Sequence, residues 1–121
     1  MKLSYIELLG KQYPVCLSLT AYEKILEAFG SYEGMANALT SESELKVARS
    51  VRTLLPILIQ AGKTYAAAIG EQVPPDLPCS PADLIDIRDP AAIRQIFRAV
   101  KNDTGRSVEA VPKNGEATPE P

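Results

Sequence analysis

The sequence predicts a mainly helical domain with a small N-terminal β-hairpin, an α+β fold arranged around one long central helix. Apolar residues recur at three- and four-residue steps over residues 41–70, the longest helical pattern in the chain. Apolar and polar residues alternate over residues 12–19, as in a half-buried strand. A chain of 121 residues that is 45% hydrophobic suits one domain with one modest core. We expect residues 1–103 to form this compact domain and residues 104–121 to form a disordered tail.

The hairpin, over about residues 2–19, has two possible connections. A two-residue turn at Gly10-Lys11 would pair Ile6 with Val15 and place Pro14 at a hydrogen-bonded position, for which proline has no N–H. A four-residue loop, Leu9–Gln12, keeps the same apolar face and moves Pro14 to a non-bonded position. We therefore favour the four-residue loop.

Two shorter helices are predicted between the hairpin and the central helix. Thr20 and Glu23 form a capping box at the start of the first helix, and Gly30 ends it. Ser31 is the expected cap of the second helix. The apolar residues expected on the buried faces are Tyr22, Ile25, Leu26 and Phe29 in the first helix and Tyr32, Met35, Ala36 and Leu39 in the second.

The central helix is predicted to begin at a capping box of Ser41 and Glu44 and to end at Gly70. Pro56 lies inside it and removes one backbone hydrogen bond, so we expect a kink near residues 52–56 or two helices that meet there. Such a long helix must be covered by other segments of the chain or by another copy of the protein. Its apolar pattern consists of Val47, Val51, Leu54, Leu55, Leu58, Gly62, Tyr65 and Ile69.

The C-terminal third contains two helix starts. Residues 71–79 hold three prolines and are predicted to form an extended loop. Ser80-Pro81 then begins a short helix, and Asp89-Pro90 begins the last one. The residues after Thr104 have no aromatic side chain and no periodicity, which is typical of disorder. The apolar stripe of the last helix consists of Ile93, Ile96, Phe97 and Val100.

Composition argues against catalysis and against cofactors. The chain has no histidine, which is the commonest general base and metal ligand, and no glycine-rich phosphate loop. Cys16 and Cys79 are isolated and are interpreted as free core cysteines rather than as a disulfide or a metal site. The net charge of −2 gives no general attraction to nucleic acid or anionic lipid. With no signal peptide and no membrane-spanning run, we expect a cytoplasmic protein that is not an enzyme.

Eight residues are candidates for protein binding. Two basic rows would suit an acidic partner or would simply be solvated helix faces. The surface of small residues around Gly62 would serve either packing within the chain or contact with another subunit, and Leu58 lies in the apolar belt of the central helix. The candidates are Lys46, Arg49, Arg52, Leu58, Gly62, Arg94, Arg98 and Lys101.

The order of these elements resembles that of the tail assembly chaperones of long-tailed, siphovirus-type phages and their prophages. The likeness covers roughly residues 3–102, and Pro56 inside the central helix departs from it. It rests on loose patterns of apolar and turn residues without a catalytic signature. The stretches that carry it are GKQYPVCLSLTAYEKI, AFGSYEGM, LLPILIQAGKTY and SPADL.

The resemblance implies a cytoplasmic, self-associating helical protein that is absent from the mature virion. Such chaperones coat the tape measure protein, keep it soluble and help to recruit tail tube subunits. Many are also made in a longer form by a ribosomal frameshift, for which residues 104–121 would suit a linker. The alternative is a small helix-turn-helix-like DNA-binding regulator, which the acidic balance and the lack of a strongly basic recognition helix oppose.

Overall fold

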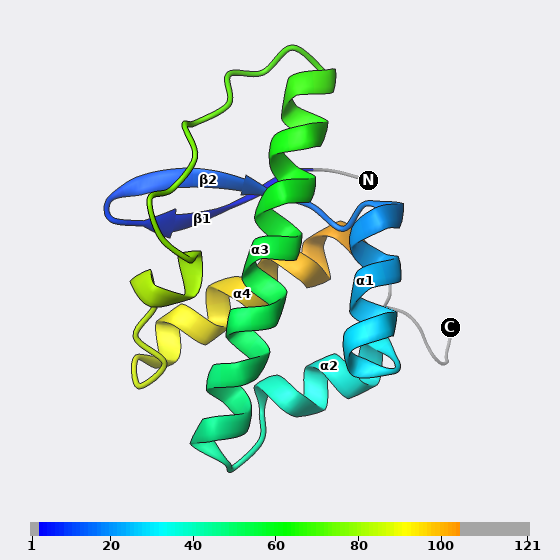
Figure 1. Cartoon of the computed structure of the whole chain (residues 1–121), viewed down its shortest axis with the longest axis vertical. Helices are drawn as coiled ribbons and strands as arrows, with labels where there is room; N and C mark the ends of the chain where they lie inside the picture. The colour runs from blue at the N-terminus through cyan, green and yellow to red at the C-terminus, as the bar shows by residue number, and fades with distance from the viewer. Residues whose placement is uncertain (1–2, 105–121) are drawn as a thin grey trace, which may run out of the picture.

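The computed structural model describes residues 3–104 of the chain (Figure 1). It confirms a mainly helical fold with an N-terminal two-stranded antiparallel hairpin and one long central helix. The predicted tail lies outside the described residues except for Thr104, which is the last residue of the final helix. The elements are β1 (Ser4–Leu8), β2 (Lys11–Val15), α1 (Leu19–Phe29), α2 (Tyr32–Leu39), α3 (Glu44–Ala68), the short 3-10 helix η1 (Pro81–Leu84) and α4 (Pro90–Thr104).

Helix α3 runs the length of the molecule, and the other elements pack around it (Figure 1). α1, α2, β2 and η1 contact α3 directly, and α4 contacts β1. The core is therefore covered by the chain itself, and α3 needs no second copy to bury its apolar belt. The largest side chains that are almost fully buried are Ile6, Leu8, Ile25, Met35, Leu54, Leu55, Leu58 and Ile96.

The hairpin differs from the prediction in its turn and its register. A two-residue turn, Leu9-Gly10, joins the strands, and the φ angles of 54° and 75° are those of a type I′ turn. Ile6 faces Tyr13, so the register is shifted by two residues and the same face still meets the core. Pro14 faces Tyr5 at a non-hydrogen-bonded pair, where the missing N–H costs nothing. The predicted four-residue loop is wrong, although Pro14 avoids a bonded position as expected.

Two helices begin at serines other than the predicted capping residues. α1 is capped by Ser18, whose Oγ accepts a backbone N–H of the first turn at 3.2 Å, and not by Thr20. α3 is likewise capped by Ser43 and not by Ser41. Ser31 caps α2 as predicted. Each misplaced start offers two hydroxyl side chains within two residues, and the one with extended backbone at the helix entrance becomes the cap.

Helix α3 continues through Pro56 as one element of 25 residues (Figure 1). Of the two predicted alternatives, a kink near residues 52–56 or two helices that meet there, the second is therefore wrong. Pro56 lies on the exposed side of α3, whereas Leu54, Leu55 and Leu58 on the other side are at most 2% exposed. Burial of this side holds the helix together despite the missing hydrogen bond. Gly70 follows α3 with a φ of 82°, in agreement with its predicted role as a helix stop.

Candidate functional site

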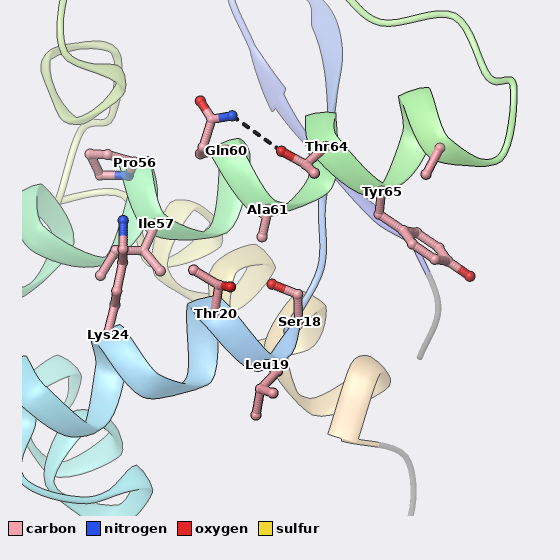
Figure 2. Close-up of a pocket in the computed structure, with 11 residues that line it drawn as sticks. Ser18, Leu19, Thr20, Lys24, Pro56, Ile57, Gln60, Ala61, Thr64 and Tyr65 are labelled. Atoms are coloured by element: carbon pink, nitrogen blue, oxygen red, sulfur yellow. Dashed lines mark hydrogen bonds between the residues drawn. The ribbon is translucent and has the colours of Figure 1, made fainter.

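Two hollows lie along the seam between α1 and α3. The first is open, has a volume of about 510 Å³ and lies beside the C-terminal half of α3 (Figure 2). Its apolar lining consists of Leu19, Pro56, Ile57, Ala61, Tyr65 and Ala68. The second hollow, of about 400 Å³, lies beside the N-terminal half of α3.

The two hollows lie next to one another along this seam, and we call the two together the α1–α3 groove. On α1, Lys24 lines the first hollow and Ala28, one helical turn later, lines the second. On α3, Thr53 and Ile57 are related in the same way. From Lys46 to Ala68 the groove follows α3 for about 33 Å at 1.5 Å per residue.

The floor of the groove is apolar and its edges are polar. In Figure 2, Ile57 and Ala61 of α3 point toward Thr20 and Lys24 of α1. Leu19 projects at one end and is 76% exposed. An exposed apolar side chain beside an apolar hollow is typical of a surface that receives another molecule.

The charged side chains that line the described groove are all cations. Lys24 lies on the α1 wall, and Lys46 and Arg49 lie on the α3 wall. None of these three forms an ion pair with a carboxylate in the described part of the chain. The groove therefore presents uncompensated positive charge on both walls.

The predicted row Lys46, Arg49 and Arg52 is divided by the structure. Lys46 and Arg49 line the groove, whereas the Arg52 guanidinium binds the Asp83 carboxylate of η1 at 2.9 Å. The remaining cation of α3, Lys63, donates a hydrogen bond to Asp76, and this contact holds the pKa of Asp76 below its ordinary value. The side of α3 that faces residues 71–90 is thus neutralised within the chain.

The second predicted row lies on α4 and does not reach the groove. Arg94, Arg98 and Lys101 are exposed, while Ile96 and Val100 of the same helix are at most 1% exposed. None of the three cations lines either hollow. The two basic rows look equivalent in the sequence, but only the row on α3 contributes cations to the groove.

Leu58 and Gly62 lie inside the core rather than on a binding surface. Leu58 is 2% exposed. A Cβ atom on Gly62 would lie 2.1 Å from the carbonyl oxygen of Pro14 and 2.5 Å from the Cα of Val15. Of the two interpretations of the small-residue surface, the structure supports close packing within the chain, because α3 approaches the backbone of β2 at this glycine.

Some surface features lie outside the groove. On α1, Tyr22 and Leu26 are 36% and 38% exposed, whereas Ala21 and Ile25 are buried, so the helix is turned relative to its predicted buried face. Cys79 is exposed and is not the core cysteine that we expected. Within residues 3–104, no group of three histidine, cysteine or acidic residues is placed to hold a metal ion. No helix in the same range is both long and apolar enough to cross a membrane.

Sequence reasoning missed the groove because a groove depends on which two helices become neighbours. One signal was available in the sequence: residues 45–70 contain four cations and no acidic residue. This asymmetry leaves part of the exposed side of the central helix positive. It did not indicate that α1 would supply the opposite wall.

Comparison with known proteins assigns no family to the chain. No protein-family model matches it, and neither do the curated proteins or the solved structures. The geometry and chemistry of the groove and the order of the elements are therefore the features that bear on function.

Proposed function

We propose that the protein is a phage tail assembly chaperone. In this role it is not an enzyme but a self-associating cytoplasmic protein that binds and solubilises the tape measure protein and helps to recruit tail tube subunits. Two features support the proposal. The first is the element order of hairpin, two short helices, long helix and terminal helix. The second, which carries most weight, is the apolar α1–α3 groove with its cationic walls.

A chaperone for a long partner needs many weak contacts rather than one strong contact. An apolar groove shields an exposed apolar stripe of the partner from water, and burial of apolar surface is the main driving force for such binding. Copies that bind next to one another on one partner act at a high effective concentration. A small domain with one groove is therefore sufficient to coat an elongated protein.

Self-association must use a surface other than the ones that the sequence suggested. The apolar belt of α3 is already covered, and the outer edge of β1 is hydrogen-bonded at Glu7 to the side chain of Gln95 at 3.2 Å and 3.4 Å. On β2, Pro14 lacks an N–H and faces α3 at Gly62. The exposed Tyr22 and Leu26 on α1 are the apolar contacts that we assign to a second copy.

Co-expression with the tape measure protein from the same genome tests the proposal. The two proteins should co-purify, and the tape measure protein should be mostly insoluble when it is expressed alone. The matched control is co-expression with an unrelated small helical protein. If the tape measure protein is equally soluble without this chain and does not co-purify with it, the chaperone proposal is refuted.

A DNA-binding regulator is the second candidate, and the cationic walls of the groove are the observation that favours it. Lys24, Lys46 and Arg49 would then contact phosphates, and binding would weaken steeply with salt. A gel shift with duplex DNA at two salt concentrations separates the candidates. The apolar floor between the cations favours a protein ligand, because a phosphate backbone has no apolar surface to bury there.

A further inference from the structure

We propose that the α1–α3 groove binds one acidic amphipathic helix of the partner protein, with its apolar stripe on the groove floor and its carboxylates along both flanks. This inference rests on the proposed function for the partner's identity and specifies which surface of the chain holds it. The chemical features required of the ligand do not depend on which protein supplies it. The ligand is defined by an apolar face and by acidic residues on either side of it.

The shape of the groove favours a helix as its occupant. The groove is long and open, and it follows α3 from Lys46 to Ala68, a length that matches about 22 helical residues. A helix presents apolar side chains at three- and four-residue spacing along one face, which fits a floor made by Ile57 and Ala61. Helix-in-groove binding of this kind is a common mode of peptide recognition.

The position of the charges defines the two flanks of the ligand. Lys24 stands on the α1 wall and Arg49 stands with Lys46 on the α3 wall, so both edges of a bound helix would meet cations. No carboxylate lines either hollow in the described chain, and no carboxylate there forms an ion pair with these cations. Exposed ion pairs contribute little affinity, but they select the partner's charge and speed up encounter.

The helices of the chain itself do not suit the groove. α1 has an exposed apolar pair, Tyr22 and Leu26, beside Glu23 and Glu27, but its 11 residues would fill only half of the groove. α3 is long enough at 25 residues, but its only acidic residue is Glu44. α4 has 15 residues and carries the cations Arg94, Arg98 and Lys101. None of these helices is both long and acidic, so we assign the groove to a different protein.

Labelled peptides added to the full chain test the inference directly. The probe is a helical peptide of about 21 residues with a leucine and alanine stripe flanked by glutamates, and its control has lysines in place of the glutamates. Fluorescence anisotropy should show that the glutamate peptide binds at least about tenfold more tightly than the lysine peptide, with the difference shrinking as salt is added. Equal binding of the two peptides, or no binding of either, would overturn the inference.

Charge-reversal variants locate the binding site. Lys24→Glu combined with Arg49→Glu should weaken binding of the glutamate peptide by about tenfold and strengthen binding of the lysine peptide. The matched control is Arg94→Glu combined with Arg98→Glu, which makes the same change in net charge on α4 and should leave both affinities unchanged. All four residues are exposed, so neither variant should unfold the protein. Equal losses from the two variants would show a general charge effect and refute the site.

A third variant tests the apolar part of the groove. Leu19→Glu should weaken binding of the glutamate peptide without unfolding the protein, because Leu19 is 76% exposed. Tyr5→Glu on β1, where the side chain is 50% exposed and does not line the groove, is its control. If only Tyr5→Glu weakens binding, the ligand lies elsewhere and the inference fails.

Two other occupants would give distinct results. A second copy is indicated if the Lys24 and Arg49 variant lowers the molar mass of the protein in light scattering and the glutamate peptide does not bind. Nucleic acid is indicated if duplex DNA displaces the bound glutamate peptide. Either result overturns the assignment. Failure of the groove variants to alter co-purification of the tape measure protein would refute this site alone, whereas failure of the wild-type chain to solubilise it would refute the proposed function.

Discussion

Leu9 occupies a backbone conformation that leucine rarely adopts. Its φ angle is 54°, and among the described residues it is the only one other than glycine with a positive φ. Its side chain is 74% exposed at the tip of the hairpin, so little burial compensates for the strain. The protein tolerates the strain because the short turn sets the strand register that places Ile6 and Leu8 in the core. The strain at Leu9 is thus the local cost of the correct strand pairing.

Leu9→Asn should therefore stabilise the protein. The change creates Asn-Gly, the favoured sequence of a type I′ turn, and relieves about 1 kcal/mol of left-handed strain. Chemical denaturation should show a higher midpoint with an unchanged slope. Leu9→Ala is the control, because alanine lacks asparagine's tolerance of positive φ. Equal stability of the asparagine and alanine variants would show that the turn is not strained.

Gly62→Ala should destabilise the protein by about 1–3 kcal/mol, the usual cost of overpacking. The added Cβ would lie 2.1 Å from the carbonyl oxygen of Pro14, and neither backbone can move without disturbing β2 or α3. Elsewhere inside a helix, a change from glycine to alanine usually stabilises by about 0.5–1 kcal/mol. The sign of the change in unfolding free energy therefore tests the contact. Exposed Ala67→Ser is the neutral control, with an expected effect within about 0.5 kcal/mol.

At the scale of the elements, the extended loop after α3 is fixed to that helix by charge. Asp76 accepts a hydrogen bond from Lys63 of α3, and Leu77 packs against the core. Further along, Asp83 of η1 pairs with Arg52 of the same helix. These contacts hold the proline-rich return segment along one side of α3, next to the groove, because Pro56 and Gln60 line both the first hollow and the hollow beside Asp76.

Asp76→Asn should loosen this loop at neutral pH. The hydrogen bond from Lys63 and the attraction of its charge lower the pKa of Asp76. The ionised carboxylate therefore stabilises the fold at neutral pH. This stabilisation is lost as the pH falls through the lowered pKa. Limited proteolysis at pH 7 should cut residues 71–79 faster in the variant than in the wild type. The thermal midpoints of the two proteins should converge as the pH falls below 3.8, the ordinary pKa of aspartate.

Asp86→Asn is the control for the loop experiment. The pKa of Asp86 is also lowered, but by the backbone N–H and the guanidinium of Arg88, only two residues away. This local pair does not connect the loop to α3. If the Asp86 variant accelerates cleavage of residues 71–79 as much as the Asp76 variant does, the pairing with Lys63 does not hold the loop.

Periodicity was sufficient to predict the elements but not their edges or their neighbours. The stripes around Ile25, Leu58 and Ile96 identified three helices, because each helix buries one continuous face. The cap at Ser18 and the turn at Leu9 were not predicted, because neighbouring residues are equally well or better suited to a cap and to a turn. The groove needs α1 and α3 side by side across about thirty residues of chain, and no local pattern contains that information.

For the molecule as a whole, we predict concentration-dependent association through α1. Tyr22 and Leu26 lie one helical turn apart on the surface. Their exposure to water is unfavourable, so burial of both side chains against a second copy would drive association. Light scattering should show a molar mass that rises with protein concentration. Tyr22→Ser combined with Leu26→Ser should reduce that rise, whereas Tyr5→Ser on the hairpin should not. A wild-type protein that remains monomeric at high concentration contradicts this prediction.

The hairpin is synthesised before the two helices that hold it in place. Gly62 of α3, which contacts the backbone of β2, lies 47 residues after Val15. Gln95, which forms a hydrogen bond with Glu7, lies 88 residues after Glu7. A two-stranded ribbon alone is marginal in water, so the hairpin depends on α3 to cover β2 and on α4 to cover β1. Closure of contacts between such distant positions is the slow step for a chain of this size. Docking of the hairpin should therefore be a late step in folding.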